Sequence, residues 1–265
     1  MPIITLTTDF GTADHYVSSV KAAILSVTSH VQIVDVTHEV PAHDLISAGF
    51  IVKDAYRAFP PRTVHIVVVD PGVGMARKPI VVASDNHYFV GPDNGVFSQV
   101  YDLDPTFKVH EITATHYMRE NPSPTFHGRD IFAPSAAQLA RGIELENFGD
   151  QVTDPVKIEI PRPKVTAEGQ IRATVIRVDR FGNLVTNVTQ SALANLMQKL
   201  SKPNVRGAGK AASASELHAT YGEAPEGGAC LLYNSAGYLE IAANKARASE
   251  ALGLKAGDPL ELELY

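Results

Sequence analysis

Cysteine is almost missing from this 265-residue chain, which contains Cys230 alone. One cysteine cannot form an internal disulfide, and its place in the apolar run ACLLY predicts a buried structural thiol rather than a nucleophile. The chain also lacks any uninterrupted stretch of about 18 apolar residues, and its start, MPIITLTTDFG, has neither the basic nor the apolar segment of a signal peptide. These absences predict a cytoplasmic protein with no membrane partner.

Long runs of lysine and arginine are absent as well, and the formal net charge is −6. That balance argues against nucleic acid or an anionic membrane as the main partner, and it leaves a small molecule as the expected one. With 45% hydrophobic residues, the chain can bury the core of one large domain or of two modest ones.

The first half of the chain alternates short β-branched runs with helical patterns. This alternation predicts an α/β domain with a mainly parallel sheet that binds ligands beyond the carboxyl ends of its strands. Asp9, Asp35 and Asp70 lie at or near such ends and together favour a site, although each alone could cap a turn. The expected strands cover residues 3–8, 31–37, 63–70 and 79–84, and the expected helices cover 16–28 and 44–59.

Prolines and charges then break the alternation, which predicts a linker at 156–167 between an α/β domain at 1–155 and a smaller β-rich domain at 168–265. The small and charged residues from Ser201 to Glu216 predict a mobile surface loop. In the second domain we expect a helix at 191–200 and five short strands, at 170–179, 183–189, 229–235, 238–243 and 260–265.

The stretch VVVDPGVGMARKP, residues 67–79, begins as a buried strand and ends in a glycine-rich turn that carries Asp70 and Arg77. It lacks the Gly-Lys-Ser/Thr tripeptide and the following helix of a phosphate loop, so it does not predict a nucleotide-phosphate site. The glycines instead allow a tight turn in which Asp70 and Arg77 form a charge-assisted pair. Such a pair can brace a loop or serve a ligand, and both interpretations stay open.

Nine of the ten histidines lie at or before residue 127, which places any imidazole chemistry in the first domain. His127 stands in HGRD ahead of a helical pattern, where Gly128 leaves room for a ligand, although a structural role is also open. His15, His43 and His87 have weaker contexts and are expected to be structural.

Two turns of the second domain are more polar than hairpins require. DRFGN, residues 179–183, interrupts a strand pattern, and Asn234 to Gly237 connects two others. Each is either a tight turn, with an asparagine in the left-handed region, or part of a ligand-facing rim.

Six motifs, in this order, resemble the S-adenosylmethionine (SAM) hydroxide adenosyltransferases, also called SAM hydrolases, which are relatives of the fluorinases and chlorinases. The resemblance runs from Ile3 to about Leu262. It implies an N-terminal α/β domain, a C-terminal β-barrel-like domain, and a homotrimer whose active sites lie between the first domain of one subunit and the second domain of its neighbour. The motifs are TTDFGTADHYV, VVVDPGVG with a following arginine, GPDNG, TFHGRDIFAPSAAQLA, DRFGNLVTN and NSAGYLEIA.

The resemblance implies that Asp70, Arg77 and His127 form a triad that handles water. The halogenating relatives lack this aspartate and this histidine, and a carboxylate would repel a halide, so the sequence matches the water-using branch. Water then attacks the ribose 5′ carbon of SAM, and methionine departs as a neutral thioether, with no cofactor or metal. Either Asp70 or His127 could take the proton, while Arg77 would hold the aspartate in place.

Substrate-binding roles follow from the same resemblance. Asp9 is expected to accept hydrogen bonds from the ribose hydroxyls, whereas the methionine ammonium and carboxylate are expected to bind Asp179 and Asn183. Where halogenating relatives carry an aromatic residue near PAHD this chain has His43, whose contact with ribose or methionine stays open. The remaining expected contacts are Ser235 at the carboxylate, backbone groups near Ala236 and Asn244 to Lys245 at the adenine edge, and Phe181 and Tyr221 as stacking faces.

Two other functions remain compatible with the residues. One is a non-catalytic adenosine or SAM sensor. The other is a metal-dependent hydrolase of a nucleoside-like substrate, although the chain has no HxH or HExxH spacing. Its candidate ligands are Asp9, Asp14, Asp70, Asp93, His15 and His127.

Overall fold

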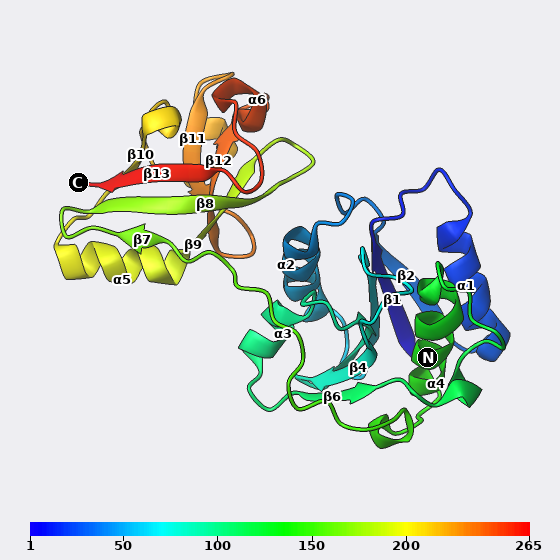
Figure 1. The fold of residues 1–265 in the computed structure, drawn as a ribbon. Helices are drawn as coiled ribbons and strands as arrows, with labels where there is room; N and C mark the ends of the chain where they lie inside the picture. The colour runs from blue at the N-terminus through cyan, green and yellow to red at the C-terminus, as the bar shows by residue number, and fades with distance from the viewer. The chain divides into compact units, whose positions relative to one another are not determined.

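The computed structural model describes residues 1–265 and divides them into two compact units, Met1–Glu159 and Ile160–Tyr265 (Figure 1). The residues predicted as a linker, 156–167, fall on both sides of this division. None of the helices combines the length and the apolar character that a membrane span requires.

The first unit is built on a six-stranded sheet in the order β2-β1-β3-β5-β4-β6. The strands β2, β1, β3 and β5 are parallel, while β4 runs antiparallel to both β5 and β6. Asp85 and Asn86, both with positive φ, make the two-residue turn that joins β4 to β5 as a hairpin. The predicted α/β class is confirmed, with a mixed sheet. The strands are β1 (Ile3–Thr8), β2 (Gln32–Thr37), β3 (Val64–Val68), β4 (Pro79–Ser84), β5 (His87–Pro92) and β6 (Lys108–Glu111).

Helices cover both faces of this sheet (Figure 1). Apolar residues of α1 and α4 pack with β1 and β3 in one buried cluster, and those of α2 and α3 pack in a second. All five residues of β3 are buried, as expected for a central parallel strand whose two faces are both covered. The helices are α1 (Tyr16–Val27), α2 (Leu45–Tyr56), α3 (Ser98–Leu103) and α4 (Ala133–Ala140).

The second unit is an antiparallel, barrel-like sheet in the order β10-β13-β8-β9-β12-β11, with β7 paired to β8. Strand β13 shows the alternation that one buried face demands, because Leu260, Leu262 and Leu264 are buried between exposed or half-buried neighbours. The five predicted strands and the helix are present. The elements are β7 (Lys164–Val165), β8 (Gln170–Val178), β9 (Leu184–Thr189), α5 (Gln190–Leu200), β10 (Val205–Ala208), β11 (Ala229–Tyr233), β12 (Tyr238–Ala243), α6 (Ala248–Leu252) and β13 (Pro259–Leu264).

The segment predicted as a mobile surface loop, 201–216, is instead partly ordered in the sheet. Its β10 pairs with β13, and Val205, Ala211 and Ala214 are buried in the core of the second unit. The prediction was wrong because small alanine side chains can be as well buried as large ones when a backbone passes close by. Gly207 shows that approach, since a Cβ there would lie 2.0 Å from the carbonyl oxygen of Ala211.

Candidate active site

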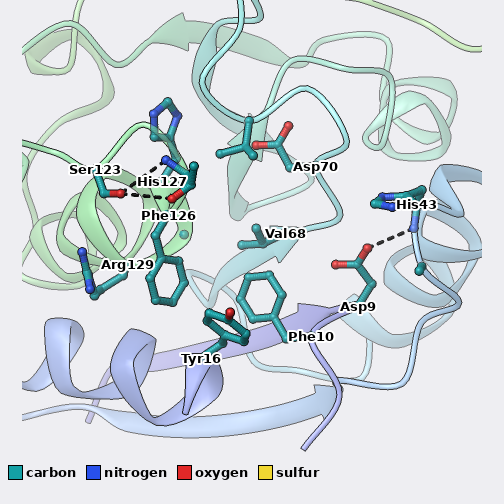
Figure 2. Close-up of a pocket in the computed structure, with 14 residues that line it drawn as sticks. Asp9, Phe10, Tyr16, His43, Val68, Asp70, Ser123, Phe126, His127 and Arg129 are labelled. Carbon is teal, nitrogen blue, oxygen red and sulfur yellow. Dashed lines mark hydrogen bonds between the residues drawn. The ribbon is translucent and has the colours of Figure 1, made fainter. Parts of the chain in front are cut away.

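A pocket of about 550 Å³ in the first unit lies beyond the ends of two parallel strands (Figure 2). Asp9 directly follows β1, and Asp70 stands two residues after β3, so the sheet brings these two carboxylates to one edge, as the strand pattern predicted. The lining residues are Asp9, Phe10, Tyr16, Ala42, His43, Val68, Asp70, Val73, Ser123, Thr125, Phe126, His127, Gly128 and Arg129.

The predicted pair between Asp70 and Arg77 is present. Arg77 Nε lies 3.1 Å from Asp70 Oδ1 and 3.0 Å from Oδ2, and Arg77 Nη2 also donates to Oδ2. The two side chains are only 5% and 9% exposed, so this ion pair is largely removed from water. Gly74 makes the turn possible: its φ is +74°, and a Cβ there would lie 2.2 Å from the Pro124 carbonyl oxygen.

His127 completes the constellation from the residue just before a π-helical turn, Gly128–Phe132, that leads into α4. Its Nδ1 lies 2.7 Å from Arg77 Nη2. A guanidinium only donates, so Nδ1 must be the acceptor and the ring proton belongs on Nε2. Burial, aided by the positive charge of Arg77, lowers the pKa of His127. His127 is therefore neutral at pH 7, with Nδ1 engaged and Nε2–H free to donate.

Asp9 is held at the mouth of the pocket by the loop before α2. Its Oδ2 accepts a hydrogen bond from the backbone N–H of His43 at 3.0 Å (Figure 2). His43 has a φ of +66° and precedes Asp44, whose side chain accepts from Ser47 N and caps α2. The backbone of His43 thus positions Asp9, while its side chain lines the pocket.

An aromatic wall made of Phe10, Tyr16 and Phe126 escaped the sequence analysis. The ring centroids lie 5.8 Å apart for Phe10 and Tyr16, 6.0 Å for Phe10 and Phe126, and 5.3 Å for Tyr16 and Phe126. Figure 2 shows the three rings together beneath Asp70 and His127. The only available signal was their position beside Asp9 and His127 in two of the motifs.

The acid of the HGRD motif has a structural role. Asp130 is 2% exposed and accepts two hydrogen bonds from Arg129, at 2.7 and 2.8 Å, and one from Ser123 N at 2.9 Å. The Arg129 guanidinium also lies 4.8 Å from the centre of the Phe126 ring. Asp130 therefore anchors both the Ser123 loop and the aromatic wall.

Asp35, the third acid expected at this edge, does not line the pocket. It forms an ion pair with Lys21 at 2.6 Å, and its Oδ1 lies 3.1 Å from His38 Nε2. His87, for which a structural role was expected, is buried and contacts the ring nitrogen of His65 at 3.2 Å. No three histidine, cysteine, aspartate or glutamate side chains lie close enough together to share a metal ion, so the ligand set of a metal-dependent hydrolase is not assembled.

The second unit contains a pocket of about 530 Å³ around the loop between β8 and β9. Of the residues predicted to bind substrate, Phe181, Asn183, Tyr221 and Lys245 line it, and the first and third expose 74% and 45% of their surface. The other lining residues are Arg180, Ala243, Ala246 and Arg247.

Asp179 does not line this pocket but holds the loop between β8 and β9 together. Its Oδ1 accepts from the backbone N–H groups of Phe181 and Asn183, at 2.9 and 2.8 Å, and its Oδ2 accepts from Asn183 Nδ2 at 3.0 Å. Gly182, with a φ of +87°, takes the left-handed conformation in the turn, and not an asparagine. The carboxylate thus shapes the rim whether or not it also meets a ligand.

The turn between β11 and β12 carries two further predicted contacts, Ser235 and Ala236, which are exposed and do not line the pocket. Asn234 Oδ1 organises this turn by accepting from Ala236 N and Tyr238 N, both at 3.0 Å. Asn244 donates to the Ala224 carbonyl at 2.7 Å and so fixes the backbone next to Lys245.

Comparisons with known proteins cover nearly the whole chain. Sequence profiles of the SAM hydroxide adenosyltransferase N-terminal and C-terminal domains match residues 4–149 and 173–261. The (R)-S-adenosyl-L-methionine hydrolase of Thermus thermophilus is 36% identical over 96% of both chains, and that of Salinispora arenicola is 35% identical over 98% of this chain and 97% of its own. A fluorinase of Nocardia brasiliensis is 27% identical over 99% and 97%.

A solved structure gives the same result for the fold. The crystal structure of an uncharacterized conserved protein from Thermotoga maritima superposes with a TM-score of 0.87. That protein is 38% identical in sequence, and the superposition covers 98% of this chain and 99% of the other.

Proposed function

This chain belongs to the SAM hydroxide adenosyltransferase family, and from that premise we propose that it is a SAM hydrolase, which converts SAM and water into adenosine and L-methionine. The observation that carries the proposal is the buried Asp70–Arg77–His127 constellation at the edge of the first pocket. It offers a carboxylate acceptor, a fixed cation and a neutral imidazole donor next to one another, which suits the activation of water.

Asp70 is the acceptor of the water proton in this mechanism. His127 Nδ1 is occupied by Arg77, whereas Asp70 Oδ1 accepts one hydrogen bond and keeps a further lone pair. The water oxygen bonds to the ribose 5′ carbon as the bond from that carbon to sulfur breaks, with its electron pair remaining on sulfur. The water proton passes to Asp70, and His127 Nε2–H donates to the attacking oxygen and orients it.

No acid is required on the leaving side, because methionine departs as a neutral thioether. The positive charge on sulfur disappears during the reaction, so a wall that solvates cations poorly favours the transition state. Phe10, Tyr16 and Phe126 supply such an uncharged aromatic surface at this pocket. Asp9 is placed to accept hydrogen bonds from the ribose hydroxyls, and its Oδ1 makes no bond within the protein.

The water-using branch of the family fits the charge of the pocket. A carboxylate at Asp70 repels a fluoride or chloride ion, while it attracts the proton of a water molecule. The relatives named as SAM hydrolases are also more similar to this chain, at about 35% identity, than the fluorinase at 27%.

In this proposal, residues of the second unit that line the second pocket or lie in turns outside its lining complete the substrate site. Phe181 and Tyr221 offer faces for adenine, Asp179, Asn183 and Ser235 bind the methionine end, and backbone groups near Ala236 and Lys245 read the adenine edge. Because the two sets belong to different units, we propose a homotrimer whose sites combine the first unit of one subunit with the second unit of its neighbour. The isolated, buried Cys230 supports a cytoplasmic location.

The decisive experiment incubates purified protein with SAM and follows adenosine and methionine by chromatography. Equimolar release of both supports the hydrolase. Binding of SAM without any release indicates the sensor instead. A chelator-treated, metal-free preparation serves as the control. If it loses activity and recovers when a divalent metal is added, the protein is a metal-dependent hydrolase instead.

Light scattering and subunit mixing test the assembly. An active monomer at micromolar concentration contradicts the trimer. An Asp70→Asn protein and a Phe181→Ala protein are refolded together and assayed at a SAM concentration at which each alone shows little turnover. Activity is regained if each site uses two subunits, because some sites then receive both intact halves. No recovery on mixing contradicts the shared site.

A further inference from the structure

Glu240 in β12 is a buried carboxyl that the proposed reaction does not use. It is 2% exposed, and its neighbours Leu239 and Ile241 point into the core of the second unit. Glu240 lies on the other face of the strand, directly across from Leu232 on β11. A carboxyl group in such a place is costly unless specific partners satisfy it.

Its partner is Tyr221, whose hydroxyl donates to Glu240 Oε1 at 2.8 Å. Asn234 and Arg177 lie near enough to favour the charged form of the carboxyl group, and Asp179 contributes negative charge. Burial is the largest influence and raises the pKa of Glu240. The bond to Tyr221 spans 19 residues of sequence and joins a core strand to a surface turn.

Tyr221 lies on a short, exposed turn, where such a bond restrains its side chain. It begins a three-residue 3₁₀ turn, Tyr221–Glu223, and its side chain is 45% exposed at the second pocket, which it lines together with Phe181. A tyrosine on a short exposed turn samples several rotamers, and ordering such a side chain on binding opposes association. A hydrogen bond from the hydroxyl to a buried group already restricts the side chain in the free protein, so less conformational entropy is lost on binding.

We propose that Glu240 is a positioning residue for the nucleobase: it binds the Tyr221 hydroxyl and so holds the tyrosine ring in place as an adenine-stacking face beside Phe181. Glu240 is too deeply buried to touch the ligand and acts through Tyr221 alone. This inference rests on the proposed function, which puts the adenosine part of SAM in the second pocket.

The test measures adenosine binding by calorimetry and SAM turnover in Tyr221→Phe, Glu240→Ala and the double variant. Each single change removes the same hydrogen bond, so each weakens adenosine and raises KM for SAM by roughly 3- to 10-fold, with kcat at saturation unchanged. The double variant is no worse than the weaker-binding single variant, because the bond can be lost only once. Glu240→Gln retains near-normal binding, since its amide oxygen can still accept from the tyrosine.

Glu263→Gln is the matched control, because Glu263 is an exposed carboxylate of the same unit, paired with Arg206, and is expected to leave binding unchanged. The proposal is overturned by any of three results. These are an unchanged adenosine affinity in Tyr221→Phe, additive losses of affinity in the double variant, or a fall in kcat with constant KM. If Glu240→Ala fails to fold, Tyr221→Phe and Glu240→Gln still decide it. Wild-type protein that releases no methionine contradicts the proposed function instead, so the two failures are distinguishable.

Discussion

The two pockets are nearly equal in size, at about 550 and 530 Å³, but different groups line them. In the first unit, Asp70 and Arg77 are buried charges that hold one another and His127 in fixed positions. In the second unit, the exposed rings of Phe181 and Tyr221 line the pocket, and Phe181 belongs to a turn whose backbone N–H groups donate to Asp179. Fixed charge suits bond breaking, where reorganisation is expensive, and flat apolar faces suit recognition of a nucleobase.

The two carboxylates Asp70 and Asp179 also differ in what holds them. Asp70 receives all its bonds from one guanidinium, so its negative charge is matched by a full positive charge. Asp179 accepts from two backbone N–H groups and one amide, all within its own loop, so it determines the shape of the rim. Removing the charge of Asp70 is therefore expected to affect rate, whereas removing the charge of Asp179 is expected to affect affinity.

The largest expected effect comes from Asp70→Asn. The amide keeps the shape but cannot accept the water proton as a carboxylate does, so kcat falls by about 10²-fold or more, the usual range for a lost general base. The affinity for SAM, measured by calorimetry, changes little. Asp85→Asn is the control, because Asp85 forms an exposed ion pair with Arg57 in the same unit. Near-normal turnover in Asp70→Asn means that the pair only braces its loop.

Arg77→Lys is expected to be the next most severe change. A lysine cannot donate to both Asp70 oxygens and to His127 Nδ1 at once, so all three groups lose their alignment. Misplacement of this kind lowers kcat by roughly 10- to 100-fold. Arg57→Lys, at an exposed pair, is the matched control for the loss of a guanidinium. A drop in affinity equal to the drop in rate indicates instead that the turn mainly shapes the pocket.

Single-residue changes also separate the binding roles of the two pockets. Asp9→Ala weakens SAM and adenosine alike, by about 1.5 to 3 kcal/mol for each charge-assisted bond to a ribose hydroxyl. Asp179→Asn weakens SAM but leaves adenosine nearly unchanged, because the amide oxygen still accepts the two backbone N–H groups while the negative charge is lost. Calorimetry measures the affinity of both variants for SAM and for adenosine. If both variants lose affinity for both ligands equally, Asp9 and Asp179 do not have separate binding roles.

The asparagine variant at position 179 matters for that comparison. Asp179→Ala removes every acceptor for the Phe181 and Asn183 backbone, so it loosens the aromatic rim and weakens adenosine as well. Asp258→Asn serves as the control, because Asp258 also closes its own turn, by accepting from Lys255 N at 3.0 Å, away from both pockets.

Local sequence was sufficient for the first four strands, for the five expected strands of the second unit and for the pair at the first pocket, but it missed β5, β6 and β10. The run VHIVV is apolar except for His65 and is buried throughout, as a doubly covered strand must be, and the glycines after it predicted the turn that joins Asp70 to Arg77. The direction of β4 could not be foreseen from its own residues. It depends on the two positive φ angles at Asp85 and Asn86, which make a hairpin where a crossover was equally compatible with the apolar runs.

Contacts between distant segments account for what the sequence analysis missed. The aromatic wall unites Phe10 and Tyr16 with Phe126, more than a hundred positions away, and no spacing rule connects them. Glu240 stands in an otherwise apolar strand, YLEIAA, and only the fold brings Tyr221 over it. The family motifs contain most of these residues, but a motif does not reveal which of its members touch one another.

The smallest expected effect is a difference in how acid affects the two units. Burial, with the charge of Arg77, lowers the pKa of His127 below its ordinary 6.5, so between these two values the unfolded chain binds a proton that the folded protein does not. The contribution of His127 to stability is therefore fully present above 6.5 and declines below it. Asp70 and Asp130 also face this ring and oppose the shift.

Glu240 has the opposite sign. Burial raises its pKa above the ordinary 4.5, with Tyr221, Asn234, Arg177 and Asp179 around it, so the folded protein binds the proton more readily than the unfolded chain. Its contribution to stability therefore grows as pH falls toward 4.5.

Hydrogen exchange at about pH 7.5 and about pH 5.5 follows the two units separately. On going from the higher to the lower pH, the amides of α4 should lose more protection from exchange in the wild type than in His127→Gln. The amides of β12 should gain more protection in the wild type than in Glu240→Gln. Shifts of the same sign in both units contradict the assigned environments, because a buried imidazole beside a cation and a buried carboxyl group cannot respond to acid alike.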